Sequence, residues 1–159
     1  MLWAAFWGSG QSELNRVHEG PDSERGGASG KIYKKLLEDN LLSIWEPGLI
    51  FMQDNAPIHT AKIVKKWLED KGIKLMEWPS YCPDLNPTEH CWARMKEWIY
   101  KHHPELLDLS ENEDEVKKAL FDALKEAWEA IGRGYPNALL NSMPDRCEAV
   151  YKTKGWHIK

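Results

Sequence analysis

Two acidic residues, Asp54 and Glu89, lie at positions in the sequence that could join them in one metal site. Asp54 follows the apolar run at residues 49–52, and Glu89 falls in the first turn of a helix predicted to begin at Asn86. The helix and strand predicted between the two acids return the chain to the same sheet edge. Carboxylates that meet there repel each other unless a cation lies between them, and Mg²⁺ or Mn²⁺ prefers such oxygen ligands. The pair therefore predicts a metal site suited to phosphoryl transfer.

Each acid also has a purely structural interpretation. Asp54 could form an Asx-turn at a strand end, and Glu89 could complete a capping box with Asn86. Asp84, in the loop before the helix, is a rival metal ligand. His59, close after Asp54, could orient a water, contact a phosphate or make a structural hydrogen bond. Spacing alone leaves these alternatives open.

Two further groups of side chains could bind a ligand. A lysine cluster after Asp54 could face the phosphates of a nucleic acid or form an ordinary solvated helix face. Histidines and cysteines later in the chain could hold zinc, but they lack the paired spacing of zinc sites. The lysines are Lys62, Lys65, Lys66, Lys71 and Lys74, and the zinc candidates are His90, Cys91, His102, His103 and Cys147.

The elements that must position these residues follow from the apolar pattern. Continuous or aromatic apolar runs predict strands, and apolar residues recurring every three or four positions predict helices. Strands are predicted at 1–7, 12–17, 49–52 and 73–78, and helices at 30–43, from a Thr60 cap to Lys71, from Asn86 to Pro104, at 111–131 with a Ser110 or Asn112 cap, and at 136–152. Loops are predicted at 19–30 and 79–87. Strands alternating with helices indicate an α/β fold in which helices pack on a sheet.

Composition limits the class of protein. The chain has 159 residues, of which 42% are hydrophobic and 29% charged, as expected for one soluble globular domain. No apolar run approaches a membrane span, and we predict no membrane partner. The net charge of −4 differs from the basic surplus of free-standing DNA-binding domains, so any DNA contact needs a local patch. Nine tryptophans predict large core anchors or, alternatively, a surface for stacking bases.

Two sequence blocks carry a family resemblance. The block DNAPIHTA begins with Asp54, and the block WPSYCPDLNPTEHCW contains Glu89. Together they resemble the catalytic domain of mariner-type transposases of the DDE superfamily, and the similarity extends over nearly the whole chain. The resemblance implies a ribonuclease-H-like mixed sheet flanked by helices. It also implies DNA cleavage and strand transfer at transposon ends, dependent on two Mg²⁺ (or Mn²⁺) ions, in the nucleus and usually as a homodimer.

The resemblance assigns roles to individual residues. Asp54 matches the family's second catalytic acid and Glu89 the third, so both are expected to be metal ligands. Asn55 and His59 match motif positions beside the site, and Asn86 matches the loop that sets the glutamate's helix. The lysines that we expect to contact DNA phosphates are Lys62, Lys65 and Lys66.

One departure from the family pattern concerns the first catalytic aspartate. In the family this residue lies on the first strand, before the segment with which this chain begins. Asp22 and Asp39 precede Asp54, but they fall in a predicted loop and a predicted helix. We therefore expect residues 1–159 to be the C-terminal part of a catalytic domain, without the first strand and the helix-turn-helix region. The prediction is little or no activity alone; the alternative is a transposon relic or a domesticated module that binds nucleic acid or protein.

Overall fold

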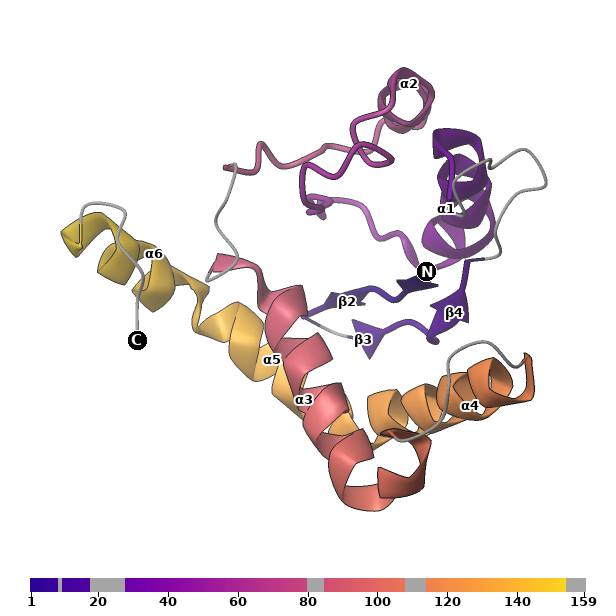
Figure 1. Ribbon diagram of the computed structural model, residues 1–159. Coiled ribbons are helices and arrows are strands. Elements are labelled where there is room, and N and C mark those ends of the chain that lie inside the picture. Colours follow the sequence, from indigo (N-terminus) through magenta and orange to yellow (C-terminus); the bar gives the residue numbers. More distant parts are fainter. Residues whose placement is uncertain (9, 18–27, 80–84, 108–113, 154–159) are drawn as a thin grey trace. The chain divides into compact units, whose positions relative to one another are not determined.

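The chain forms two compact units, and each is described by itself (Figure 1). A computed structural model describes residues 1–8, 10–17, 28–79, 85–107 and 114–153. Unit 1 comprises Met1–Ala5 and Asn15–Tyr81, and unit 2 comprises Phe6–Leu14 and Cys82–Lys159. The predicted loop at 19–30 lies mostly outside the described residues, as do the candidate helix caps Ser110 and Asn112.

Unit 1 begins with a short antiparallel ladder. Strand β1 (Leu2–Trp3) pairs with β4 (Asn15–Arg16), and the Val17 backbone N–H donates to the Met1 carbonyl at 2.8 Å. The predicted strands at 1–7 and 12–17 are thus present, but as shorter segments. The ladder supplies Trp3 and Val17 to the core of this unit.

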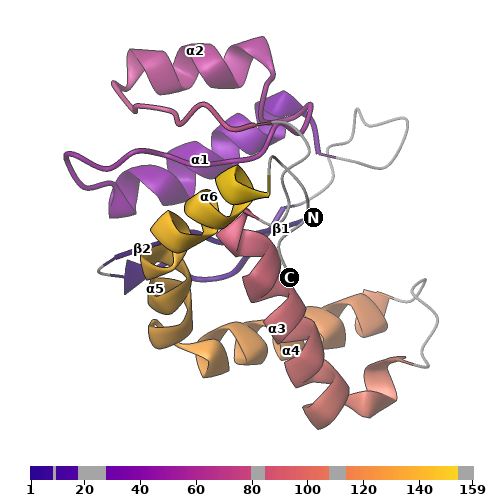
Figure 2. The same cartoon turned by 90° about the vertical axis from the view of Figure 1, so that its left-hand side faces the viewer.

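Helices α1 and α2 form the body of unit 1 and lie side by side (Figures 1 and 2). Helix α1 (Gly30–Ile44) begins at Ser29, whose hydroxyl accepts from the Ile32 N–H, as a helix cap does. In both α1 and α2 (Lys62–Asp70), apolar residues recur at helical spacing and form a stripe along one side of the helix. The two stripes face one another. The buried residues of this interface are Tyr33, Leu36, Leu37, Leu41, Val64, Trp67 and Leu68.

The start of α2 corrects one prediction. The sequence places the cap at Thr60, but the N-cap is Ala61, which makes no side-chain bond. The Thr60 hydroxyl instead donates to the carbonyls of Ala56 and Pro57, within the preceding turn. The start of α1 requires a glycine where it passes Ala61. A Cβ on Gly30 would lie 2.7 Å from the Ala61 Cβ.

The predicted strands at 49–52 and 73–78 form one parallel bridge in place of a long ladder. Phe51 pairs with Leu75: its N–H donates to the Lys74 carbonyl, and its carbonyl accepts from the Met76 N–H, both at 2.8 Å. The two predicted extended segments are therefore present, but they pair at one position and are shorter than predicted. Two parallel segments joined by one bridge still align the residues that follow each of them.

Unit 2 is mainly helical. Its ladder joins β2 (Phe6–Trp7) and β3 (Gly10–Gln11). The helices are α3 (Pro87–His102), the 3₁₀ helix η2 (Pro104–Leu107), α4 (Asp114–Ile131), α5 (Gly134–Asn141) and α6 (Met143–Lys152). Helix α3 packs against α4 and α5, and α6 packs against α5. The single helix predicted at 136–152 is thus two helices.

Trp128 anchors unit 2. Its ring centroid lies 6.5 Å from those of both Phe6 and Trp92, and its indole N–H donates to the Ser12 carbonyl at 2.8 Å. Trp128 and the small residues Ala123 and Ala127 form the buried face of α4, while Leu120 is 37% exposed. Other buried residues of this unit include Leu14, Asn86, Pro87, Cys91, Met95, Ile99, Pro136 and Leu139.

The core interpretation holds for three of the tryptophans, and the others in the described ranges are half-buried. Trp3, Trp67 and Trp128 are each less than 9% exposed. Among the helices in the described ranges, none is long and apolar enough to cross a membrane.

Candidate active site

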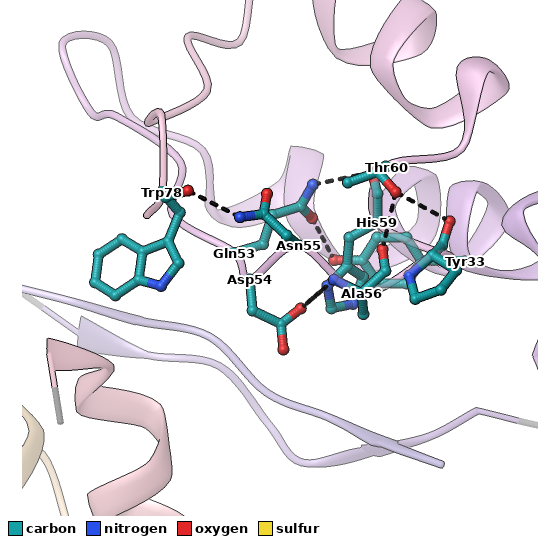
Figure 3. Close-up of polar contacts among 9 residues, drawn as sticks. Tyr33, Gln53, Asp54, Asn55, Ala56, His59, Thr60 and Trp78 are labelled. Carbon is teal, nitrogen blue, oxygen red and sulfur yellow. Dashed lines mark hydrogen bonds and ion pairs between the residues drawn. The ribbon is translucent and has the colours of Figure 1, made fainter. Parts of the chain in front are cut away.

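Asp54 lies just beyond the parallel bridge of unit 1, at the end of the segment that contains Phe51. The next residue, Asn55, donates from its side-chain amide to the Trp78 carbonyl at 2.8 Å. This bond joins the loop after Phe51 to the end of the neighbouring extended segment (Figure 3). The predicted place of Asp54, at the carboxyl end of a sheet segment, is therefore confirmed. Such ends of α/β sheets are common ligand sites.

The two oxygens of the Asp54 carboxylate differ in their surroundings. Oδ1 accepts from the Ala56 backbone N–H at 3.0 Å and from His59 Nδ1 at 2.6 Å. The bond to Ala56 is an Asx-turn, so the structural interpretation of Asp54 holds for this oxygen. Within the described residues Oδ2 has no hydrogen-bond partner, and the side chain is 47% exposed. One oxygen is thus fixed in place and the other is available to a ligand.

His59 makes the structural hydrogen bond that was one of its predicted roles. Since an ionised carboxylate has only acceptors, Nδ1 donates and the ring presents Nε2 as its other nitrogen. The ring also packs on Tyr33, with centroids 4.5 Å apart and planes at 40°. His59 is therefore held from two sides, by an acid and by an aromatic ring of helix α1.

A cleft of about 530 Å³ opens beside Asp54 within unit 1. Acidic, basic and aromatic side chains line it together, so it could hold a charged group beside an aromatic one. Its lining includes Asp54, Asn55, His59, Lys65, Glu69 and Trp78. Lys65, one of the lysines predicted to contact phosphate, therefore shares a cleft with the candidate metal ligand.

Glu89 lies in the first turn of α3, in unit 2. Asn86 caps this helix, its side-chain oxygen accepting from the Thr88 N–H at 3.0 Å, as predicted. The reciprocal half of a capping box is absent from the described contacts, because the Glu89 carboxylate has no hydrogen bond there and is exposed. The unpaired backbone N–H groups at the start of a helix stabilise a nearby carboxylate electrostatically. Glu89 is thus presented to solvent with its oxygens available.

The predicted acids belong to separate units. Asp54 is part of unit 1 and Glu89 part of unit 2, so the structure describes each carboxylate within its own surroundings. In the described ranges no three His, Cys, Asp or Glu side chains form a metal-binding group. The rival ligand Asp84 lies outside the described residues, as does Asp22. Asp39, on α1, pairs with Lys35 at 2.6 Å.

The three lysines predicted to contact phosphate lie on α2, whereas Lys71 and Lys74 of the predicted cluster follow the helix. Lys62, Lys65 and Lys66 are exposed, and none forms an ion pair with a described residue. They are spaced so that they share the outer side of the helix, opposite buried Val64 and Trp67. This arrangement suits either solvation or contact with an anionic partner.

The zinc alternative finds no support in unit 2. His90 lies 2.5 Å from an Arg146 guanidinium nitrogen, and His102 contacts the Trp98 carbonyl through Nδ1. Cys91 is 1% exposed, and burial raises the pKa of its thiol to about 12. Zinc binds the thiolate, so a thiol held protonated is a poor ligand.

Sequence reasoning missed two residues beside Asp54. The Tyr33 hydroxyl donates to Gln53 Oε1 at 2.8 Å, and Gln53 Nε2 donates to the His59 carbonyl at 3.3 Å. The sequence indicates Tyr33 only as part of the apolar face of a helix. Gln53 adjoins Asp54 in sequence, but no local pattern indicates that its amide joins a tyrosine to a histidine.

The surroundings of Asp54 and Glu89 can be compared with known proteins. The family model described as "DDE superfamily endonuclease" matches residues 24–110, which is more than half of the chain and includes both acids. The chain therefore belongs to the DDE superfamily endonuclease family. The resemblance to mariner-type transposases is confirmed.

Two transposases are similar over the whole chain. The transposase of the element Tcb2 from Caenorhabditis briggsae is 32% identical, and that of Tc1 from Caenorhabditis elegans is 30% identical. In both cases 100% of this chain matches 54% of the relative. The chain thus spans about half the length of these relatives.

The fold matches that of a solved mariner transposase. The crystal structure of the catalytic domain of Mos1 mariner transposase superposes with a TM-score of 0.68 at 18% identity, covering 100% of this chain and 82% of that one. A second structure, of the same Mos1 domain with Raltegravir and Mn, gives 0.67 at 20% identity, with the same coverage. The ribonuclease-H-like α/β fold is confirmed, although the sheet in the described ranges is limited to short ladders and one bridge.

Proposed function

We propose that this chain acts in DNA cleavage and strand transfer at transposon ends, as part of a metal-dependent transposase. The observation that carries the proposal is the Asp54 carboxylate, fixed through Oδ1 and available through Oδ2, within a family of DDE endonucleases. Residues 1–159 would then be the C-terminal part of a catalytic domain. The match to 54% of each transposase relative fits a chain that corresponds to part of such a protein.

The donor chemistry of the two acids fits a hard divalent cation. Asp54 and Glu89 are exposed, and Asp54 Oδ2 and both Glu89 carboxylate oxygens are free of described partners. Mg²⁺ or Mn²⁺ prefers oxygen ligands. Structures of the Mos1 catalytic domain have been solved with Mn and with Mg. We therefore assign both acids as ligands of the catalytic ions, of which the intact family site is expected to hold two. Such ions activate the attacking oxygen and stabilise the leaving oxygen of a phosphodiester.

The chain's own residues would hold the DNA around that site. Lys65 lines the cleft beside Asp54, and Lys62 and Lys66 extend the basic side of α2 away from it. Lysines bind phosphates as point charges and neutralise the backbone without reading its sequence. Mos1 structures are described as a strand transfer complex and as paired-end complexes with transposon ends. We propose transposon-end DNA as the partner here, with a homodimer as the active form and the nucleus as its location.

Metal binding by the purified chain tests the role of both acids. Asp54→Asn and Glu89→Gln should each weaken Mn²⁺ binding by about tenfold or more, since even residues that only support a metal ligand commonly contribute that much. Asp122→Asn and Glu129→Gln remove exposed carboxylates of α4 and should leave the affinity unchanged. Calorimetric titration with Mn²⁺ measures the effect. Equal affinity in Asp54→Asn and Asp122→Asn would overturn the assignment of Asp54.

A nicking assay separates catalysis from binding. The family uses three acids, and we assign two within residues 1–159, so we expect little or no cleavage by these residues alone. Any Mn²⁺-dependent nicking that is present should disappear in Asp54→Asn and in Glu89→Gln. DNA binding that survives both substitutions and removal of metal by a chelator would favour the alternative, a non-catalytic nucleic-acid-binding module.

A further inference from the structure

Asp54 is held by a chain of contacts that begins on another element of unit 1. His59 Nδ1 donates to Asp54 Oδ1, and Gln53 Nε2 donates to the His59 carbonyl. Gln53 in turn accepts a hydrogen bond from the hydroxyl of Tyr33, on helix α1. Figure 3 shows these side chains converging on the loop between Gln53 and Thr60. The loop therefore closes on itself and is attached to helix α1 through Tyr33.

Tyr33 contacts this loop at both ends. Its hydroxyl reaches Gln53 at the beginning, at 2.8 Å, and its ring packs on the His59 imidazole near the end, at 4.5 Å. The side chain is 2% exposed and belongs to the core cluster that α1 and α2 form. A buried ring in a close-packed core has little freedom to move. Tyr33 thus transmits the rigidity of the helix pair to a loop that is otherwise exposed.

The direction of each hydrogen bond in this network is defined. Burial raises the pKa of the Tyr33 phenol above its ordinary value, so the hydroxyl stays protonated and donates to Gln53 Oε1. The Gln53 amide is then oriented with Nε2 toward the His59 carbonyl. With its backbone held there, His59 can direct Nδ1 at Asp54 Oδ1, which leaves Oδ2 free of described partners.

We propose that Tyr33 is a positioning residue for Asp54, acting through Gln53 and His59 to keep one carboxylate oxygen fixed and the other directed at a ligand. The inference rests on the proposed function, because it gives Asp54 the role of a metal ligand. A site that holds its ligand in advance loses less entropy on binding, so weakening the network should weaken metal binding without unfolding the protein.

The first test detects the hydrogen-bond network in the metal-free protein. Tyr33→Phe keeps the packed ring and removes only the hydroxyl, and Gln53→Met removes the amide at similar size. In each variant, the nuclear magnetic resonance signals of the His59 ring, in isotope-labelled histidine at one neutral pH, should move toward those of Asp54→Asn. The control Tyr135→Phe removes a hydroxyl on α5 that has no hydrogen bond in the described residues. Unchanged His59 signals in both folded variants would overturn the proposal.

The second test uses Mn²⁺ affinity. Tyr33→Phe should weaken Mn²⁺ binding by about three- to tenfold, the range expected for one hydrogen bond. His59→Ala should weaken it further. The combined variant should bind within about twofold of His59→Ala alone, because coupled residues are not additive. Independent effects that multiply would contradict a path through His59.

Failure of the proposed function would look different. In that case Mn²⁺ affinity would be the same in the natural chain and in Asp54→Asn, and Tyr33→Phe would also leave it unchanged. The metal-free His59 signals would still support or overturn the positioning of Asp54 by Tyr33. Urea unfolding of Tyr33→Phe and Tyr135→Phe shows whether each variant retains a cooperative fold.

Discussion

Asn86 caps the helix that carries Glu89. It is the one polar residue among the buried side chains of the described ranges, at 8% exposure, and its side chain caps α3. The cap satisfies a backbone N–H that has no partner within the helix. Because Asn86 already caps the helix, Glu89 in its first turn can face solvent. The buried Asn86 amide caps the helix, and the exposed Glu89 carboxylate remains available to a ligand.

Replacing Asn86 should destabilise α3. Asn86→Ala is expected to lower the free energy of unfolding by about 1 kcal/mol, the usual contribution of an N-cap, while Asn86→Asp should retain most of it. Urea denaturation measures the change. Asn137→Ala, at an exposed position of α5, is the matched control and should have little effect. An equal loss in Asn86→Ala and Asn137→Ala would show that the cap contributes nothing.

At the scale of elements, α2 combines two functions. Its inner face, with Val64 and Trp67, packs on α1, and its outer face carries three lysines. The helix that packs beside the loop region of Asp54 thus also carries a local cluster of positive charge in a chain of net charge −4. Local basic charge is sufficient for phosphate contact even in an acidic protein.

The lysines of α2 should control the salt dependence of DNA binding. Changing Lys62, Lys65 and Lys66 together to Gln should weaken DNA binding. The slope of log affinity against log salt should fall by roughly 0.9 for each phosphate that these lysines neutralise in the natural chain. Fluorescence anisotropy at several salt concentrations measures the slope. The control changes three lysines of α4, namely Lys117, Lys118 and Lys125, by the same total charge. Equal slopes in the two triple variants would contradict the assignment to α2.

The whole molecule is organised as two units with separate apolar cores. The cluster around Leu37 draws on the ladder of β1 and β4, on α1 and on α2. The buried residues of α3 include Met95, and those of α4 include Trp128. Both Leu37 and Met95 are 0% exposed, so each is a sensitive point of its own core.

A cavity in one core should be detected mainly in the same unit. Leu37→Ala and Met95→Ala should each cost about 2–5 kcal/mol, as large-to-small substitutions in cores do. Hydrogen exchange should then accelerate in α1 and α2 for the first variant, and in α3 and α5 for the second. Leu42→Ala, 40% exposed on α1, is the control. Equal acceleration in both units by either core variant would show that the two cores unfold together.

The sequence by itself determined the family and the positions of most helices, and it predicted Asp54 and Glu89 as site residues. Helical periodicity and caps are local signals, which is why α1, α3 and α4 begin and end close to their predicted positions where the structure describes them. The blocks around Asp54 and Glu89 are also local, and they were enough to indicate a DDE transposase. Asn86 could be assigned as a cap because its partner is two residues away.

Only the tertiary structure decided how Asp54 is held. Tyr33 and Gln53 are 20 residues apart in the sequence, and no local pattern records that their side chains meet. The extended segments are shorter than their apolar runs suggested, because a ladder needs a partner strand along its whole length and here one bridge forms. The groups that bond Asp54 Oδ1 are close in the sequence, but the contact of Tyr33 with Gln53 and His59 is long-range. Long-range hydrogen bonds and pairing partners are properties of the folded chain.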